Sequence, residues 1–235
     1  MTTDRNTHSL LRRFIVLNRR LSRGLYLIAE QLTSRRPGVV EFEQQIVPNL
    51  LFPKARVLDV GGGKSPIIDA ETKRRLRLYV VGLDLSADEL ARAPQGIYDK
   101  VIVGDVATVP IHEQFDVILS RTLLEHAPDT SRAIANLTGA LSPGGTMAHY
   151  LPCRRAFFAV LSRCLGAETS RSVLFRIYPE KRSGAGFPAY YHCCVPSAMA
   201  RLCRECGLLV ETRAYYESEY FKANRHNRDE RQKNG

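Results

Sequence analysis

The middle of the sequence alternates between short apolar runs and segments with helical character. Several runs are almost continuously apolar, which is typical of parallel strands buried on both faces. Strands that alternate with helices favour a parallel sheet covered on both sides. We therefore predict strands over residues 56–60, 78–85, 100–106, 115–120, 145–151 and 208–216, and helices over 66–76, 86–93, 129–141 and 196–206.

This alternation predicts an α/β fold with a doubly wound, mostly parallel sheet. The 235 residues are enough for one domain with additions. We expect a helical extension over residues 1–40, the sheet domain over 41–221, and a polar basic tail over 222–235. Residues 152–194 are rich in aromatic and basic side chains and contain no clear strand, so we expect a substrate-side insertion there.

The net charge of +10 belongs mainly to the two ends of the chain. Residues 1–40 contribute +6 and residues 222–235 contribute +3, which leaves the middle nearly neutral. A nucleic-acid groove would more often carry its positive charge on the folded face. A nucleic-acid partner is therefore not expected.

Residues 10–32 form a basic amphipathic pattern, with leucines at helical spacing and arginines on the other faces. Two interpretations stay open: a helix packed on the domain, and a helix lying on an anionic membrane surface. No run reaches the roughly 18 apolar residues of a membrane span, and the first residues do not resemble a signal peptide. We expect a cytoplasmic protein, with peripheral membrane contact as the alternative.

Six cysteines lie in the second half of the chain, and a cytoplasmic location would keep them reduced. Cys203 and Cys206 form a C-x-x-C, but no second pair of ligands completes a zinc site. We therefore expect buried thiols, and no metal.

The stretch "VLDVGGGKSP" follows the first predicted strand and contains a run of glycines. It is not a Walker phosphate loop, because the residue that should be the loop's first glycine is Leu58. A dinucleotide fingerprint is incomplete as well, since its third glycine falls on Pro66. Ser65 is expected to cap the helix that starts near Pro66. Asp59, at the end of the strand, suits a cationic ligand better than a phosphate.

Here the sequence resembles the class I S-adenosylmethionine-dependent methyltransferases of the broad type 11 group. Asp59 and the glycine turn match the first motif, Asp84 in "VVGLDL" the second, and Asp105 in "GDV" the third. "FDVILS" with "LLEH", and "LSPGGTM", resemble the motifs of the fourth and fifth strands. The resemblance spans residues 55–150 in order and implies a Rossmann-like methyltransferase fold. It implies that S-adenosyl-L-methionine is bound by Asp59, Gly61, Gly62, Gly63, Asp84, Leu85, Asp105, Val106 and Ser120.

The same resemblance implies methyl transfer. His126, directly after "LLE", is the first candidate for a general base, and a purely packing histidine is the alternative. The N/D-P-P-Y motif of amino-methylating nucleic-acid enzymes is absent after the fourth strand, which reads Ser120-Arg121-Thr122-Leu123. We expect a small-molecule, sugar or lipid-linked acceptor methylated at oxygen. Two alternatives stay open: an NAD-linked oxidoreductase, and a membrane-recruited, non-catalytic binding protein. For the fold itself, the resemblance implies a seventh strand, which we expect to be short or missing.

Overall fold

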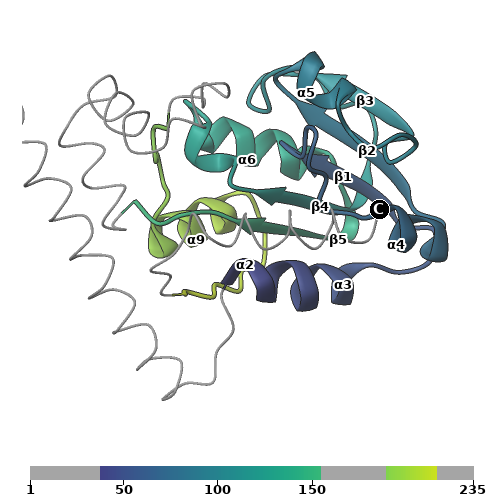
Figure 1. Cartoon of the computed structure of the whole chain (residues 1–235). Coiled ribbons are helices and arrows are strands. Elements are labelled where there is room, and N and C mark those ends of the chain that lie inside the picture. The colour runs from purple at the N-terminus through teal and green to yellow at the C-terminus, as the bar shows by residue number, and fades with distance from the viewer. Residues whose placement is uncertain (1–37, 155–188, 216–235) are drawn as a thin grey trace, which may run out of the picture. The chain divides into compact units, whose positions relative to one another are not determined.

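The computed structural model describes residues 38–154 and 189–215 (Figure 1). The chain divides into two compact units, Met1–Gln45 with Arg213–Gly235, and Ile46–Thr212. In the first unit, Glu41 Oε1 accepts hydrogen bonds from Arg213 Nη1 (3.1 Å) and Tyr215 Oη (2.8 Å). The second unit contains the sheet. The helix expected over residues 10–32 lies outside the described residues.

Within the described residues, the sheet has five strands in the order β3-β2-β1-β4-β5. All four strand pairs are parallel, as the alternation of strands and helices predicts. The order reverses between β1 and β4, and ligands of open α/β sheets bind at such a switch point, beyond the carboxyl ends of the strands. The strands are β1 (Arg56–Val60), β2 (Tyr79–Asp84), β3 (Lys100–Val103), β4 (Phe115–Arg121) and β5 (Leu141–Tyr150).

Helices connect and cover these strands, and three of them begin with a side-chain cap. Asp69, Ser86 and Asp129 each accept a hydrogen bond from the backbone N–H three residues ahead, which satisfies a donor that the helix itself leaves unpaired. The helices are α2 (Gly38–Glu41), the π-helix η1 (Phe42–Ile46), α3 (Val47–Leu50), α4 (Ala70–Leu76), α5 (Ala87–Ala91), the 3-10 helix η2 (Leu124–His126), α6 (Thr130–Gly139) and α9 (Pro196–Glu205).

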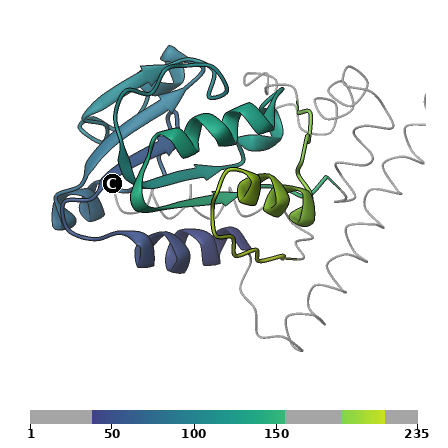
Figure 2. The same ribbon diagram turned by 180° about the vertical axis from the view of Figure 1, so that it is seen from behind.

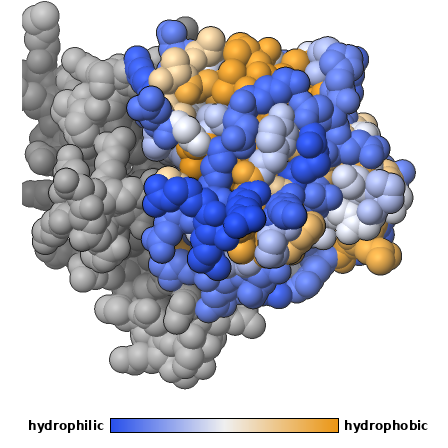
Figure 3. All heavy atoms as spheres, turned by 90° about the vertical axis from the view of Figure 1, so that its right-hand side faces the viewer, coloured by the Kyte–Doolittle hydropathy of each residue, from blue (hydrophilic) through white to orange (hydrophobic). Residues whose placement is uncertain are grey.

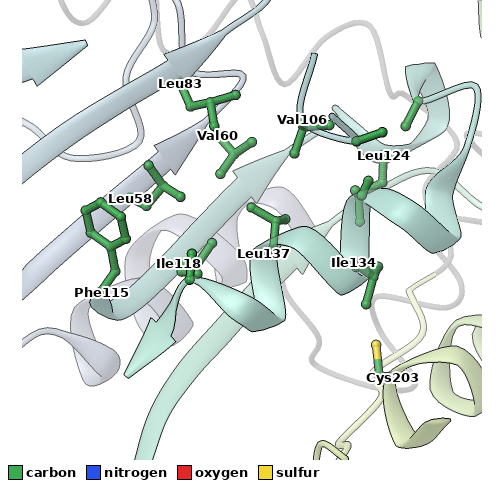
Figure 4. Packing of buried hydrophobic residues seen from close by; sticks show 14 of the residues in the cluster. Leu58, Val60, Leu83, Val106, Phe115, Ile118, Leu124, Ile134, Leu137 and Cys203 are labelled. Atoms are coloured by element: carbon green, nitrogen blue, oxygen red, sulfur yellow. The ribbon is translucent and has the colours of Figure 1, made fainter. Parts of the chain in front are cut away.

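The main core lies between the sheet and the helices α6 and α9, which pack on the same cluster (Figure 2). Figure 4 shows Leu58 of β1 and Ile118 of β4 facing Leu137 of α6, with Cys203 of α9 at the border. Fully burying one leucine or isoleucine contributes about 1.5–3 kcal/mol. This packing fixes the strands whose carboxyl ends carry the acidic residues.

Three sequence expectations are wrong in detail. Residues 208–215 form no strand: Leu208 and Val210 pack on the core, but the stretch does not join the sheet formed by the described strands. The third strand ends at Val103 instead of residue 106, because Asp105 accepts from Ala107 N and turns the chain. The first predicted helix begins at Ala70, and its cap is Asp69 instead of Ser65.

The face of the molecule on the side of α4 is mostly hydrophilic (Figure 3). Among the ion pairs of the described residues, Glu113 pairs with both Arg56 and Lys100. Exposed pairs at a protein surface contribute little to stability, with a median of about 0–1 kcal/mol. Among the helices of the described residues, none is both long and apolar enough to cross a membrane.

Candidate active site

Asp59 lies near the end of β1, fully buried beneath the glycine turn. Its Oδ2 accepts hydrogen bonds from the backbone N–H of Ile67 (2.9 Å) and from Tyr98 Oη (3.3 Å). Its Oδ1 is buried and has no hydrogen-bond partner among the described residues. Burial raises the pKa of Asp59 to about 7. A cation next to this carboxyl would favour its ionised form and satisfy the orphaned oxygen.

The glycine turn leaves no room for side chains. A Cβ on Gly61, which has a φ of +73°, would lie 2.5 Å from Leu123 Cδ1. A Cβ on Gly62 would lie 2.5 Å from Asp59 Oδ2 and 2.6 Å from Tyr98 Oη. Gly63, with a φ of +45°, adopts the left-handed region that glycine tolerates best. The turn is therefore built so that its backbone lies directly against acidic side chains.

Asp84 ends β2 beside this turn, and a Cβ on Gly63 would lie 3.0 Å from Asp84 Oδ2. Its other oxygen, Oδ1, accepts from the backbone N–H of Ser86 (3.0 Å). Burial raises the pKa of Asp84, and the charge of Glu89 adds to the shift. The next residue, Leu85, is 58% exposed. Together they present a carboxylate and an apolar surface.

Asp105 and Val106 follow β3 at the same edge of the sheet. Asp105 Oδ1 accepts from the backbone N–H of Ala107 (2.8 Å), which closes a tight turn. Val106 is buried, and its carbonyl accepts from Asn136 Nδ2 of α6 (2.9 Å). The same amide donates to the carbonyl of Val109 (2.8 Å), so that α6 holds the turn in place.

Ser120 lies near the end of β4 and is buried. Its hydroxyl forms a 2.8 Å hydrogen bond with Nδ1 of His149, its pairing partner on β5. Burial lowers the pKa of His149 to about 4, so the imidazole is neutral near pH 7. The side chain of Ser120 is thereby engaged by the neighbouring strand.

His126 ends η2, just beyond β4, and its side chain is about one-third exposed. Its Nε2 lies 3.8 Å from Oε1 of the preceding residue, Glu125. Glu125 is almost fully buried, and its Oε2 has no partner within the described part of the chain. Burial raises the pKa of Glu125 to about 8, so near pH 7 the carboxyl is largely neutral. The contact between the two side chains is therefore not a strong ion pair.

Residues 189–195, which we name the returning segment, lie against η2 and the start of α6. The backbone N–H groups of Tyr190 (2.7 Å) and Tyr191 (3.0 Å) both donate to the carbonyl of Glu125. Thr130 Oγ1 donates to the carbonyl of His192 (2.9 Å). These bonds connect residues more than 60 positions apart and fix the segment beside His126.

The returning segment also meets the end of β5. The backbone N–H of Arg154 donates to the carbonyl of Cys194 (2.6 Å), so the end of the chain that follows β5 is joined to the returning segment. Burial raises the pKa of Cys194 to about 12, and no disulfide involves it. Most of the insertion expected at residues 152–194 lies outside the described residues, and the returning segment at its end lies beside η2.

Residues 58–149 match the family model described as "Methyltransferase domain". This range contains most of the sheet and every acidic residue of the site described above. Residues 58–149 form a methyltransferase domain with the class I, Rossmann-like fold.

Curated relatives are similar to this methyltransferase domain and to part of the rest of the chain. A ubiquinone biosynthesis O-methyltransferase of Aromatoleum aromaticum is 29% identical over 160 residues, covering 65% of this chain and 63% of that protein. A trans-aconitate 2-methyltransferase of Variovorax paradoxus is 32% identical over 118 residues, covering 48% and 44%. The chain spans 61–65% of the length of the ubiquinone biosynthesis relatives that it matches.

Solved structures show the same fold. A protein of Bacillus halodurans described as a methyltransferase superposes with a TM-score of 0.51 at 18% identity, over 72% of this chain and 70% of its own. Phosphoethanolamine N-methyltransferase 2 of Haemonchus contortus, in complex with S-adenosyl-L-methionine, also gives 0.51, at 17% identity, over 70% and 36%. At these identities the likeness concerns the fold alone.

The residues of the methyltransferase domain fit its cofactor. The orphaned, buried Oδ1 of Asp59 is an acceptor for a cationic amino group. The three glycines form a cradle that any Cβ would fill. Asp84 supplies a carboxylate that can accept two hydroxyl donors, with Leu85 exposed beside it. No group of three metal ligands occurs in the part of the chain that the structure describes.

Sequence reasoning missed three residues of this site. Tyr98 donates to Asp59 from a loop between α5 and β3, and no motif marks that loop. Asn136 holds the Val106 turn from the middle of α6. Glu125 stands next to the predicted His126, and only its burial distinguishes it from a surface carboxylate. Each role depends on a contact between distant parts of the chain.

Proposed function

We propose that this protein transfers the methyl group of S-adenosyl-L-methionine to an oxygen of a small-molecule, sugar or lipid-linked acceptor. The observation that carries the proposal is the buried, unsatisfied Oδ1 of Asp59 beneath a turn of three glycines, with Asp84 beside it. A buried carboxylate oxygen is costly unless a partner satisfies it. The amino group of this cofactor supplies such a partner.

Different residues of the chain have separate roles in binding the cofactor and in the reaction. Asp59 binds the cationic end of the cofactor, Asp84 binds its hydroxyls, and the turn at Asp105 and Val106 borders its ring. The bound cofactor supplies an electrophilic methyl group. The protein has to align the acceptor with that methyl group and exclude water. His126, exposed at the end of η2, is the group that takes the proton of an acceptor hydroxyl.

Two observations support an oxygen acceptor. The relatives of similar sequence include several named ubiquinone biosynthesis O-methyltransferases, at 28–30% identity. A hydroxyl nucleophile keeps its proton at neutral pH and therefore needs a base, which the exposed ring of His126 offers. The acceptor itself is proposed only by class.

Calorimetry with S-adenosylhomocysteine tests the cofactor part of the proposal. The wild type should bind with a Kd of about 1–100 μM, and Asp84→Ala should weaken binding about 10- to 100-fold, because a charge-assisted pair of hydrogen bonds is lost. Glu113→Ala is the matched control: it removes an acid that pairs with Arg56 at the start of β1, the end of that strand away from Asp59, so binding should stay unchanged. Binding of NADH in place of the homocysteine compound would overturn the proposal.

A transfer assay tests the acceptor class. Methyl-labelled cofactor is incubated with the protein and, separately, with a lipid extract and a soluble metabolite extract. Label should enter one of these fractions in an ether linkage, and His126→Ala should reduce the rate about 10²- to 10⁴-fold, because His126 is the proposed base. Label found on nitrogen would contradict the proposed oxygen acceptor.

A further inference from the structure

Tyr98 lies in the loop between α5 and β3, beneath the glycine turn. Its hydroxyl is 3.3 Å from Asp59 Oδ2 and 3.2 Å from the carbonyl oxygen of Gly63. A phenol has one proton to donate, so the two acceptors share it. The tyrosine thus connects the buried carboxylate with the backbone of the turn that follows it.

Two glycines leave the space that Tyr98 occupies. A Cβ on Gly62 would come within 2.6 Å of the hydroxyl, and a Cβ on Gly82 of β2 would come within 2.9 Å of three ring carbons. Both distances are shorter than real Cβ contacts. Gly82 has no part in the glycine turn, so its lack of a side chain is explained by the ring that packs on it.

The loop that carries Tyr98 is held firmly. Asp99 exchanges two hydrogen bonds with Val80 of β2: its N–H donates to the Val80 carbonyl (2.8 Å), and its Oδ2 accepts from the Val80 N–H (2.7 Å). Lys73 of α4 donates to Asp99 Oδ1 (2.8 Å) and to the carbonyl of Gly96 (2.9 Å). Ile97, directly before Tyr98, is buried. The hydroxyl is therefore positioned by bonds on both sides of it.

We propose that Tyr98 is a positioning residue of the cofactor site, which acts through Asp59: it holds one carboxylate oxygen in place and leaves the other free for the cationic group of the cofactor. This inference rests on the proposed function. It adds a residue that belongs to none of the motifs and contacts the cofactor loop from below.

The hydroxyl also favours the charged form of Asp59. Burial raises the pKa of Asp59, and the nearby charge of Asp84 adds to that shift, whereas the bonds from Ile67 and Tyr98 lower it. Burial likewise raises the pKa of Tyr98, so the phenol keeps its proton and remains a donor. Removing the hydroxyl should leave Asp59 protonated up to a higher pH.

The other charged groups around this carboxyl come from β2, α5, the turn itself and β4, where Arg121 donates to the carbonyl of Ser65 (3.1 Å). Asp84 faces it from β2. Glu89 of α5 lies near Asp84, and Lys64 of the turn is ion-paired with Glu89 at 3.0 Å. Lys64, the cation of the turn, is thus paired with Glu89. The donors that lower the pKa of Asp59, against the effect of burial, are the N–H of Ile67 and the hydroxyl of Tyr98.

The test is the pH profile of S-adenosylhomocysteine binding for the wild type and Tyr98→Phe, measured by calorimetry between about pH 6 and pH 8.5. Wild-type affinity should rise through about pH 7, as Asp59 ionises. In the variant the midpoint should move upward, so that affinity falls about tenfold near pH 7 and about threefold or less near pH 8.5. A role confined to packing would lower affinity by the same factor at every pH.

A measurement without ligand separates this inference from the proposed function. The carboxyl carbon of Asp59, assigned with the help of Asp59→Asn, is titrated by NMR in the wild type, in Tyr98→Phe and in the control Tyr79→Phe. Tyr79 is another partly buried tyrosine, at the start of β2. The pKa of Asp59 should rise only in Tyr98→Phe. An unchanged pKa overturns the inference even if binding occurs, and absence of binding by the wild type overturns the proposed function instead.

Discussion

The carboxyl ends of β1, β2 and β3 differ from those of β4 and β5 in how their polar groups are satisfied. In the first region each acid accepts a hydrogen bond from a backbone N–H nearby in the sequence. For Asp84 and Asp105 the donor is two positions ahead, at Ser86 and Ala107. For Asp59 the donor is Ile67, eight positions ahead. In the second region the partners are distant: Ser120 and His149 are 29 residues apart, and Thr130 and His192 are 62. Each acid of the first region accepts a bond from nearby backbone, and Tyr98 and Asn136 add distant bonds to it, whereas the bonds named for the second region are all distant.

The two regions also differ in charge near neutral pH. Burial raises the pKa of Asp59 to about 7, so the first region holds a carboxyl that a bound cation can ionise. In the second region the pKa of Glu125 is about 8 and that of His149 about 4, so both buried groups are mainly neutral. Under the proposed function, the cofactor would bind beside the first region and the acceptor hydroxyl would lie beside the more neutral second region.

Gly62→Ala should give the largest effect, and it concerns the first region. The new Cβ would lie 2.5 Å from Asp59 Oδ2 and 2.6 Å from Tyr98 Oη, so both must move. We expect binding of S-adenosylhomocysteine to weaken more than about 100-fold, and overpacking to lower the free energy of unfolding by about 1–3 kcal/mol. Calorimetry and urea unfolding measure the two effects.

Gly139→Ala in α6 is the matched control for this prediction. A Cβ there meets no atom within 4 Å, so alanine should stabilise the helix by about 0.5–1 kcal/mol and leave binding unchanged. If Gly62→Ala bound the ligand like the wild type, the turn would not be the close-packed cradle described above.

Glu125→Gln should change stability in the second region in a pH-dependent way. The folded-state pKa of Glu125 is about 8 and its ordinary value is 4.5, so between these values the unfolded chain has lost a proton that the folded protein keeps. Stability therefore falls as the pH rises through this window. Glutamine does not titrate, so the stability of the variant has no such dependence on pH. Between about pH 5 and pH 8 the free energy of unfolding of the variant should rise by about 2 kcal/mol relative to the wild type. This gain is smaller than the full pKa shift implies, because a buried site can relax.

Urea unfolding at several pH values measures this gain. Glu71→Gln, on the exposed surface of α4, is the control and should show no pH-dependent difference from the wild type. A difference between Glu125→Gln and the wild type that stays constant with pH would mean that Glu125 is not a buried, neutral acid. Binding of S-adenosylhomocysteine should change little, which separates the two regions.

The fold was largely predictable because it depends on local patterns. Near-continuous apolar runs predicted all five strands, and caps such as Asp129 marked helix starts. The expected strand at 208–216 was wrong for residues 208–215, because an apolar run becomes a strand only where a neighbouring strand offers hydrogen bonds. Ser65 failed as a cap since the chain continues in turns as far as Asp69.

The sequence predicts those site residues that directly follow a strand. Asp59, the glycines, Asp84 and Asp105 follow their own strands, and parallel strands bring their ends to one edge. Tyr98 and Glu125 could not be found in this way. The position of Tyr98 depends on the space left by Gly62 of the turn and Gly82 of β2. The burial of Glu125 depends on the returning segment, which lies more than 60 residues later in the sequence.

Thr130→Val should have the smallest effect and tests how the returning segment is held. Thr130 is buried, and its hydroxyl donates to the carbonyl of His192, so valine keeps the shape and removes one hydrogen bond. We expect a loss of about 1 kcal/mol in the free energy of unfolding, with S-adenosylhomocysteine binding unchanged. Thr138→Val is the control, because the Thr138 hydroxyl bonds only to Ile134, within the same helix, and should cost less. If the two variants lost equal amounts of stability, the hydrogen bond between Thr130 and His192, which lie 62 residues apart, would contribute nothing beyond the packing around it. A loss of cofactor binding in Thr130→Val would show that the two ends of the sheet depend on each other.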